Sequence, residues 1–245
     1  NNWNNYNDDL KRIVEETKKG KKIIVPFGLL SLIDDPEIHL KNSKIFAQNI
    51  TPTLSNDFKK DINENLIKIG YFSADFNKHA VSHLIFKMLC LHNKKKFKIY
   101  CYSYGFDEMD DLHKLIKENV DIYRDIRNIS DHEVALLARK DGIDIAIDLQ
   151  GYTDKHRINI FANRAAPLQV NYLGYPGSMG VDFIDYIIAD RNLIPDDNQK
   201  FFSEKIIFLP HQYQVQNNEL QISETIPTKK DLGLPEDYFV YCAIN

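Results

Sequence analysis

Apolar residues at the start of the chain recur at helical spacing. They are Trp3, Tyr6, Leu10, Ile13 and Val14. This spacing predicts an amphipathic helix over about residues 1–20 that packs on a partner surface. Pro26 and Gly28 interrupt the next apolar run, so residues 23–36 are expected to form a packed, irregular connector. An Asp-Asp-Pro sequence then predicts a second helix from about residue 34 to 49, followed by a polar linker over 51–65.

From residue 66 the pattern changes to alternating short apolar runs and helical periods. The predicted strands are 67–72, 97–102, 120–124, 143–149, 168–173, 184–189 and 205–209. The predicted helices are 79–92, 108–118, 131–141, 156–163 and 197–203. Strands separated by helices of this length pair in parallel through right-handed crossovers, which predicts an α/β, doubly wound sheet with helices on both faces. Residues 212–227 are polar and unpatterned, and a further strand is expected over 238–244.

Composition narrows the class of protein. Hydrophobic residues make up 43% and charged residues 27% of the chain, as in ordinary globular proteins. The net charge of −4 argues against a nucleic-acid partner, because no basic surplus neutralises phosphates. No segment approaches the ~18 apolar residues of a membrane span, so no membrane partner is expected. Three cysteines without metal-type spacing lie in apolar runs, which predicts buried free thiols and a reducing, cytoplasmic setting.

Two histidines one helical turn apart, His79 and His83, follow the first strand of the predicted sheet. Three interpretations compete: a metal pair, two packing residues, or a polar pair that faces a substrate. The metal interpretation lacks a third ligand, since Ala80, Val81 and Ser82 stand where an HExxH motif needs its glutamate. The third interpretation is favoured, because a neutral imidazole beside a helix N-terminus can accept a proton or hold a hydroxyl.

Polar and glycine residues also follow three predicted strands. Asp75 is interpreted as the N-cap of the helix that follows, with orientation of a nearby imidazole as the alternative. Asp148 is interpreted equally as a holder of loop amides or as a substrate ligand. Glycines at strand ends permit positive φ and close approach of a ligand. The candidate substrate-binding set is therefore His83, Asp148, Gly151, Tyr152, Gly174, Tyr175, Pro176 and Gly177.

Five segments, in this order and spacing, resemble the catalytic region of the protein O-GlcNAc transferase family, which includes SPINDLY-like proteins. They read IGYFSADFNKHAVSH, IDLQGYTDKHR, RAAPLQVNYLGYPGSMG, DYIIAD and FFSEKIIFLPH. The resemblance runs from about Trp3 to Asn245, and the LGYPG block with its preceding APLQ is the most specific part. It implies an inverting glycosyltransferase that moves a sugar, expected to be N-acetylglucosamine from UDP-GlcNAc, to serine or threonine of a protein acceptor without a metal.

The resemblance also implies a domain division and site roles. Residues 1–65 would be a helical transition segment that follows tetratricopeptide repeats, 66–227 the N-terminal Rossmann-like lobe of a GT-B enzyme, and 228–245 the start of a second lobe. His79 matches the family's catalytic histidine, and Gly174, Tyr175 and Pro176 match a loop that lines the cleft. Most donor contacts, including a lysine for the pyrophosphate, would lie beyond Asn245, so the chain alone is expected to be inactive.

One further departure from the family pattern and two alternative functions stay open. A second histidine of animal members has no counterpart here, since the matching helix ends Leu137, Ala138, Arg139, Lys140. The same scaffold also suits a fucosyltransferase or an asparagine-linked glucosyltransferase. A non-catalytic protein-interaction module is the alternative from a different class.

Overall fold

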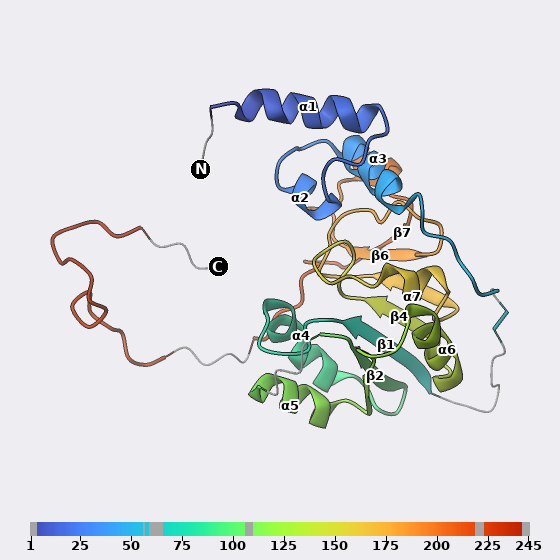
Figure 1. The fold of residues 1–245 in the computed structure, drawn as a ribbon. Helices are drawn as coiled ribbons and strands as arrows, with labels where there is room; N and C mark the ends of the chain where they lie inside the picture. Colours follow the sequence, from blue (N-terminus) through green and yellow to red (C-terminus); the bar gives the residue numbers. More distant parts are fainter. Residues whose placement is uncertain (1–3, 56, 59–65, 106–109, 219–222, 242–245) are drawn as a thin grey trace.

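The computed structural model describes residues 4–55, 57–58, 66–105, 110–218 and 223–241 (Figure 1). Within them, seven parallel strands form one sheet in the order β3-β2-β1-β4-β5-β6-β7. The strands are β1 (Ile67–Ser73), β2 (Phe97–Ser103), β3 (Ile122–Asp125), β4 (Ile145–Asp148), β5 (Leu168–Asn171), β6 (Tyr186–Ala189) and β7 (Lys205–Phe208). All seven lie within predicted strands or overlap them, so the predicted doubly wound sheet is confirmed.

Helices cover both faces of this sheet. They are α4 (Ala80–Leu91), α5 (Asp111–Asn119), α6 (Asp131–Asp141) and α7 (Ile158–Ala162). Successive residues of a strand point to opposite faces, so Tyr71 packs in the same core as Ile85 of α4, and Phe72 packs in the same core as Val134 of α6. The two apolar cores explain why the central strands are apolar at nearly every position, as both faces of a parallel sheet are buried.

The order of strands reverses direction between β1 and β4. From β1 the chain winds outward through β2 to β3, then returns to β4 on the other side of β1 and winds outward to β7. Open α/β sheets bind ligands in the crevice at the carboxyl ends of the strands that flank such a reversal. The loops that follow β1 and β4 are therefore the first place to look for a site.

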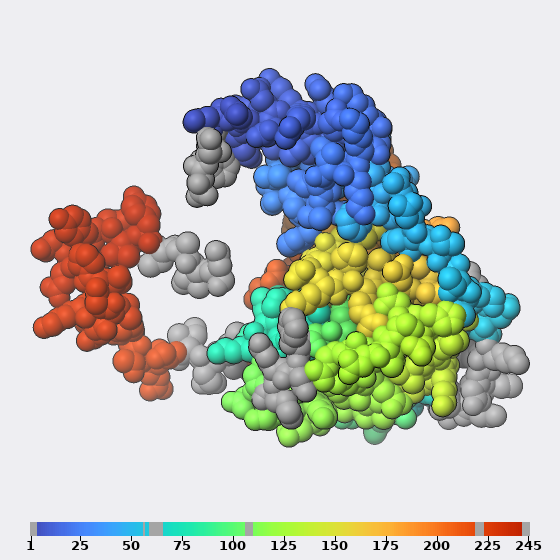
Figure 2. All heavy atoms as spheres, in the orientation of Figure 1, coloured from blue at the N-terminus to red at the C-terminus, as the bar shows by residue number. Residues whose placement is uncertain are grey.

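Three helices precede the sheet: α1 (Tyr6–Lys18), α2 (Pro26–Leu30) and α3 (Pro36–Ala47). The Asp35 side chain caps α3 by accepting from the amides of Glu37 and Ile38. Figures 1 and 2 show these helices as a layer at one end of the sheet domain, with α3 against the sheet side. Ala47 at the end of α3 is buried in the same core as Phe72. The predicted helices of this segment are confirmed, while Trp3 lies outside the described residues.

Two details of the prediction were wrong. Residues 26–30 form the short helix α2 instead of an irregular connector, because Pro26 occupies its first turn, where a missing N–H costs nothing. The helix predicted over 197–203 is present as the 3-10 helix η1 (Asp196–Phe201). Residues 238–241 form no strand, and Phe239 is 81% exposed; residues 242–244 lie outside the described residues. A strand needs a neighbour with which to pair, and Figure 1 shows the 223–241 segment standing away from the sheet.

Two further expectations concern thiols and membranes. Cys101 is a buried free thiol, as predicted, whereas Cys90 is only partly buried and Cys242 lies outside the described residues. No helix among the described residues is long and apolar enough to cross a bilayer. The predicted domain boundaries near residues 65 and 227 stay a prediction.

Candidate active site at the β1–β4 switch point

Gln150 connects the loop after β4 to the loop after β1. Its Oε1 accepts from Ser73 Oγ at 3.1 Å and from the amide of Ala74 at 3.2 Å. Its Nε2 donates to Asp75 Oδ2 at 3.0 Å and to the carbonyl of Asp154 at 2.9 Å. Gln150 is 4% exposed, and these four bonds use both of its donors and both lone pairs of its oxygen. The glutamine therefore fixes the two loops relative to each other.

His79 stands at the beginning of α4, directly after the first of these loops. It is the N-cap of the helix: its backbone is extended, and its Nδ1 accepts from the amide of Val81 at 3.3 Å. The same Nδ1 lies 3.6 Å from Asp75 Oδ2, and the His79 side chain is 47% exposed. The prediction that Asp75 is the N-cap was wrong, and the alternative, a carboxylate beside the imidazole, describes its position. The exposed ring leaves Nε2 available to a substrate.

His83 lies one turn further along α4, and its amide donates to the carbonyl of His79 at 3.0 Å. Its side chain is exposed. Among the described residues, no group of three or more histidine, cysteine, aspartate or glutamate side chains is arranged to hold a metal ion. The two histidines thus present imidazoles to solvent on adjacent turns, and the role of His83 in substrate binding stays a prediction.

Asp148, the last residue of β4, is 2% exposed. Its Oδ1 accepts from the amide of Gln150 at 2.9 Å. Burial raises the pKa of this carboxyl to about 6, and the amides of Gln150 and Gly151 oppose the rise. Asp148 therefore holds the loop amides, one of its two predicted roles, and its carboxylate reaches a substrate only if the loop opens.

Gly151 and two tyrosines form the wall beneath the loops. Gly151 has φ +52°, and a Cβ placed on it would lie 2.3 Å from Cβ of Tyr175. The rings of Tyr152 and Tyr175 meet edge to face with centroids 5.4 Å apart, and they are 3% and 1% exposed. The hydroxyl of Tyr152 donates to the carbonyl of Met179 at 2.8 Å. Little of either side chain reaches solvent, so both tyrosines support the loops by packing beneath them and do not offer their rings to a ligand.

The loop after β5 approaches the loop after β4 closely. A Cβ on Gly174 would lie 2.0 Å from the carbonyl oxygen of Leu149, so the glycine permits this contact between backbones. Asn171 Nδ2 donates to the carbonyls of Tyr175 and Gly177 at 2.9 and 3.3 Å, which closes the turn. Pro176 is partly exposed at its tip. The three predicted loops therefore meet at one edge of the sheet, as expected for carboxyl ends of parallel strands.

Glu204 anchors the far side of this loop, and sequence reasoning did not select it. Its carboxylate accepts from Ser178 Oγ at 2.8 Å and from the amide of Met179 at 2.6 Å. Glu204 is 5% exposed, and burial raises the pKa of its carboxyl above the usual range. A glutamate directly before the apolar strand β7 was the available signal. Gln150 was likewise overlooked, because a glutamine in a loop carries no sequence pattern for its partners.

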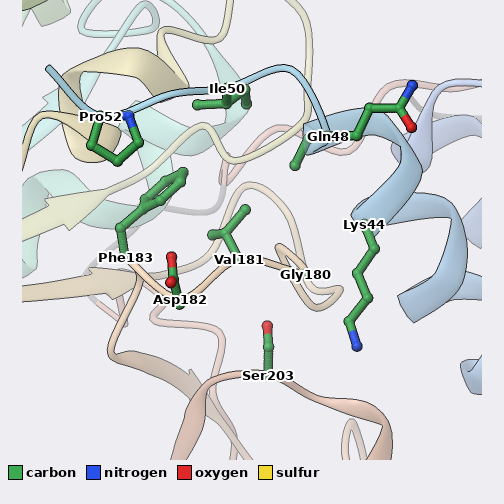
Figure 3. Close-up of a pocket in the computed structure, with 10 residues that line it drawn as sticks. Lys44, Gln48, Ile50, Pro52, Gly180, Val181, Asp182, Phe183 and Ser203 are labelled. Carbon is green, nitrogen blue, oxygen red and sulfur yellow. The ribbon is translucent and has the colours of Figure 1, made fainter.

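A hollow of about 570 Å³ lies elsewhere, between α3 and the segment that follows the β5 loop (Figure 3). It is lined by Lys44, Ala47, Gln48, Ile50, Pro52, Gly180, Val181, Asp182, Phe183 and Ser203. None of the predicted site residues contributes to it. The candidate site is instead the open edge of the sheet around His79.

A doubly wound sheet with an exposed histidine at its switch point is the architecture of a Rossmann-like lobe of the GT-B type. The chain belongs to glycosyl transferase family 41, whose sequence profile matches residues 41–222. This membership confirms the resemblance to O-GlcNAc transferases and SPINDLY-like proteins.

Individual relatives agree. The chain is 29% identical over 239 residues to a probable UDP-N-acetylglucosamine–peptide N-acetylglucosaminyltransferase, SEC, of Arabidopsis thaliana, covering 91% of this chain and 24% of that protein. It is 34% identical over 156 residues to the probable transferase SPINDLY of the same plant, covering 60% of this chain and 16% of that protein. A solved structure of a K341M mutant of the Thermobaculum terrenum O-GlcNAc transferase matches with a TM-score of 0.69 and 28% identity, over 74% of this chain and 35% of that one. The chain thus spans about a quarter or less of these curated relatives.

Proposed function

We propose that this chain forms the acceptor-side catalytic lobe of an inverting glycosyltransferase. The reaction transfers N-acetylglucosamine from UDP-GlcNAc to a serine or threonine hydroxyl of a protein. Membership of glycosyl transferase family 41 supports the reaction class. The relatives are UDP-N-acetylglucosamine–peptide N-acetylglucosaminyltransferases, which supports the donor and the acceptor. The observation that carries the proposal is the position of His79: half-exposed, at the carboxyl end of β1, beside the β1–β4 switch point.

His79 acts as the general base in this proposal. Nε2 takes the proton as the acceptor O–H bond breaks, and the acceptor oxygen forms a bond to the anomeric carbon of the sugar. The bond from that carbon to the diphosphate oxygen breaks on the opposite face, and UDP leaves with the electron pair. A base whose ordinary pKa lies near neutral pH suits this step. Gly151 and Gly174 let the loops after β4 and β5 pack closely on Tyr175 and on the Leu149 carbonyl beside this edge of the sheet.

The rest of the enzyme is also part of the proposal. A leaving diphosphate needs a cation or a helix N-terminus, and we place most donor contacts, including a lysine, in a second lobe. We propose that the reaction needs no metal, as the resemblance to O-GlcNAc transferases implies. Tetratricopeptide repeats upstream of α1 are the expected partner of the helical segment, and the cytoplasm the expected location, in line with the free thiol of Cys101.

The test is a transfer assay on the longer protein, with this chain joined to its second lobe. UDP-GlcNAc, GDP-fucose and UDP-glucose are offered in parallel with serine-, threonine- and asparagine-containing peptides. The proposal expects transfer from UDP-GlcNAc to a hydroxyl. Transfer from GDP-fucose would show that the proposed donor is wrong, and transfer to asparagine would show that the proposed acceptor is wrong. Either result would still identify the protein as a glycosyltransferase. Binding of acceptor protein without transfer from any donor would favour the interaction module.

A further inference from the structure

Two groups compete for the same nitrogen of His79. Nδ1 lies 3.3 Å from the amide nitrogen of Val81 and 3.6 Å from Oδ2 of Asp75. The Val81 amide donates, so it requires an unprotonated Nδ1. The Asp75 carboxylate accepts, so it requires a proton on Nδ1. In a neutral imidazole one nitrogen carries the proton, and each partner therefore selects a different tautomer.

The choice of tautomer decides whether the ring can act as a base. With Nδ1 bound to the Val81 amide, the proton sits on Nε2, and the exposed nitrogen has no lone pair to offer. With Nδ1–H directed at Asp75, the lone pair is on Nε2, which faces solvent. Only the second arrangement fits the role assigned to His79 above, and this inference rests on that proposed function.

We propose that Asp75, held by Gln150, is the positioning residue that keeps the proton of His79 on Nδ1 and so leaves Nε2 free to accept the acceptor's proton. In this arrangement Nδ1–H donates to Asp75 Oδ2, and the ring gives up the weaker cap of α4.

The surroundings of Asp75 favour this outcome. The Asp75 side chain is only 13% exposed, so water supplies few hydrogen-bond donors to its carboxylate. A largely buried carboxylate gains more from a charge-assisted hydrogen bond than an exposed one does. Gln150 Nε2 holds Oδ2 in place at 3.0 Å, and Gln150 is itself fixed by Ser73 and Ala74. The Val81 amide depends less on His79 Nδ1 than the Asp75 carboxylate does. The first amides of a helix lack intrahelical partners, and water at this exposed end of α4 can accept from them.

The same contact matters more once the proton has moved. A protonated imidazole donates from both nitrogens, so it cannot accept from the Val81 amide at all. Asp75 then faces a positive charge across a short gap and stabilises it. The carboxylate thereby aids proton abstraction without touching the substrate, and it acts only through His79.

The experiment measures the tautomer of His79 directly. The 245-residue chain is labelled with ¹⁵N, and two-bond ¹H–¹⁵N correlation spectra are recorded at about pH 8.5, well above the ordinary range of histidine. The two ring nitrogens have distinct shifts according to which carries the proton. The wild type is expected to hold the proton mainly on Nδ1. Asp75→Asn keeps the size of the side chain but lets its amide donate, so the ratio of the two tautomers is expected to fall by about tenfold.

A matched control separates this effect from loss of a charge. Asp8→Asn removes one exposed carboxylate in the first turn of α1, on a different element from His79, and should leave the ratio unchanged. A wild type with its proton mainly on Nε2, or an equal ratio in wild type and Asp75→Asn, overturns the inference. The wild-type spectrum alone is decisive if Asp75→Asn does not fold. Since no turnover is measured, a failed transfer assay would remove the proposed function and leave this result standing.

Discussion

The hydroxyls of Ser43 and Tyr175 lie 3.2 Å apart, although 132 residues separate them in the sequence. Ser43 belongs to α3 and Tyr175 to the loop after β5, and both side chains are buried. The bond joins the N-terminal helical segment to a wall of the candidate site. The helical segment therefore takes part in fixing the site as well as preceding the sheet.

A double-mutant cycle tests this connection. Ser43→Ala and Tyr175→Phe each remove one hydroxyl and leave the other buried without its partner, so each should lower the free energy of unfolding by about 1–3 kcal/mol. The double variant should lose less than the sum, with a coupling of about 0.5–1.5 kcal/mol. Urea denaturation of the four chains gives the numbers. Additive losses would show that the two hydroxyls do not bond in solution.

Gly151→Ala should destabilise the chain by about 2–5 kcal/mol. The new Cβ would sit 2.3 Å from Cβ of Tyr175, and the backbone there has φ +52°. Gly20→Ala is the matched control: Gly20 has φ +82° and no atom within 4 Å of a new Cβ, so it carries the backbone strain without the clash. Its cost should be about 1–2 kcal/mol. Equal losses in the two variants would mean that Tyr175 moves away from the new Cβ at position 151 at little cost in free energy.

Asp148 should make the chain less stable as pH rises. Its pKa in the folded chain is about 6, raised from the ordinary value of 3.8, because burial disfavours the charged form. The folded chain therefore binds more protons than the unfolded chain between these values, and stability falls as pH rises through 6. The difference of 6 minus 3.8 corresponds to about 3 kcal/mol.

Asp148→Asn removes the titrating carboxyl. The other titrating groups are the same in the variant and the wild type, so their contributions cancel when the two unfolding free energies are subtracted. The unfolding free energy of Asp148→Asn minus that of wild type should increase by about 1–3 kcal/mol between about pH 4 and pH 7. Denaturant titrations at several pH values measure it. A difference that stays constant with pH would place the carboxyl of Asp148 in contact with water.

Much of the fold could be predicted because its signals are local. The central strands are apolar runs bounded by polar turns, and the helices between them are long enough to enforce parallel pairing. Where local signals conflict with packing, prediction failed. Residues 238–241 have the composition of a strand but no neighbouring strand. Residues 26–30 form a helical turn, although Pro26 and Gly28 predict an irregular segment.

The candidate site was predicted in outline for the same reason. Histidine and glycines directly after strands mark loops at the carboxyl edge of a parallel sheet. Which side chain bonds which could not be predicted, since such partners lie far apart in sequence: Gln150 bonds Asp75 from 75 residues away, and Ser178 bonds Glu204. The choice of His79 over Asp75 as the helix cap also depends on backbone geometry that propensity does not encode.

His79→Ser should separate the two roles of this residue. Serine is among the best N-caps, whereas the bond from Nδ1 to the Val81 amide is long at 3.3 Å. The serine variant is therefore expected to be at least as stable as wild type, and more stable than His79→Ala by about 1 kcal/mol. Neither variant leaves a large cavity, because the His79 side chain is 47% exposed. Urea denaturation of the three chains measures these differences.

Transfer activity should not follow stability in these variants. Both variants lack a base, so in the longer transferase each should lose about 10²–10⁴-fold in kcat, and the improved cap of His79→Ser should recover none of it. The rate is measured with saturating UDP-GlcNAc and a serine-containing peptide. A serine variant that transfers as fast as wild type would reduce His79 to a helix cap, and the general base would then have to be sought elsewhere on this edge of the sheet.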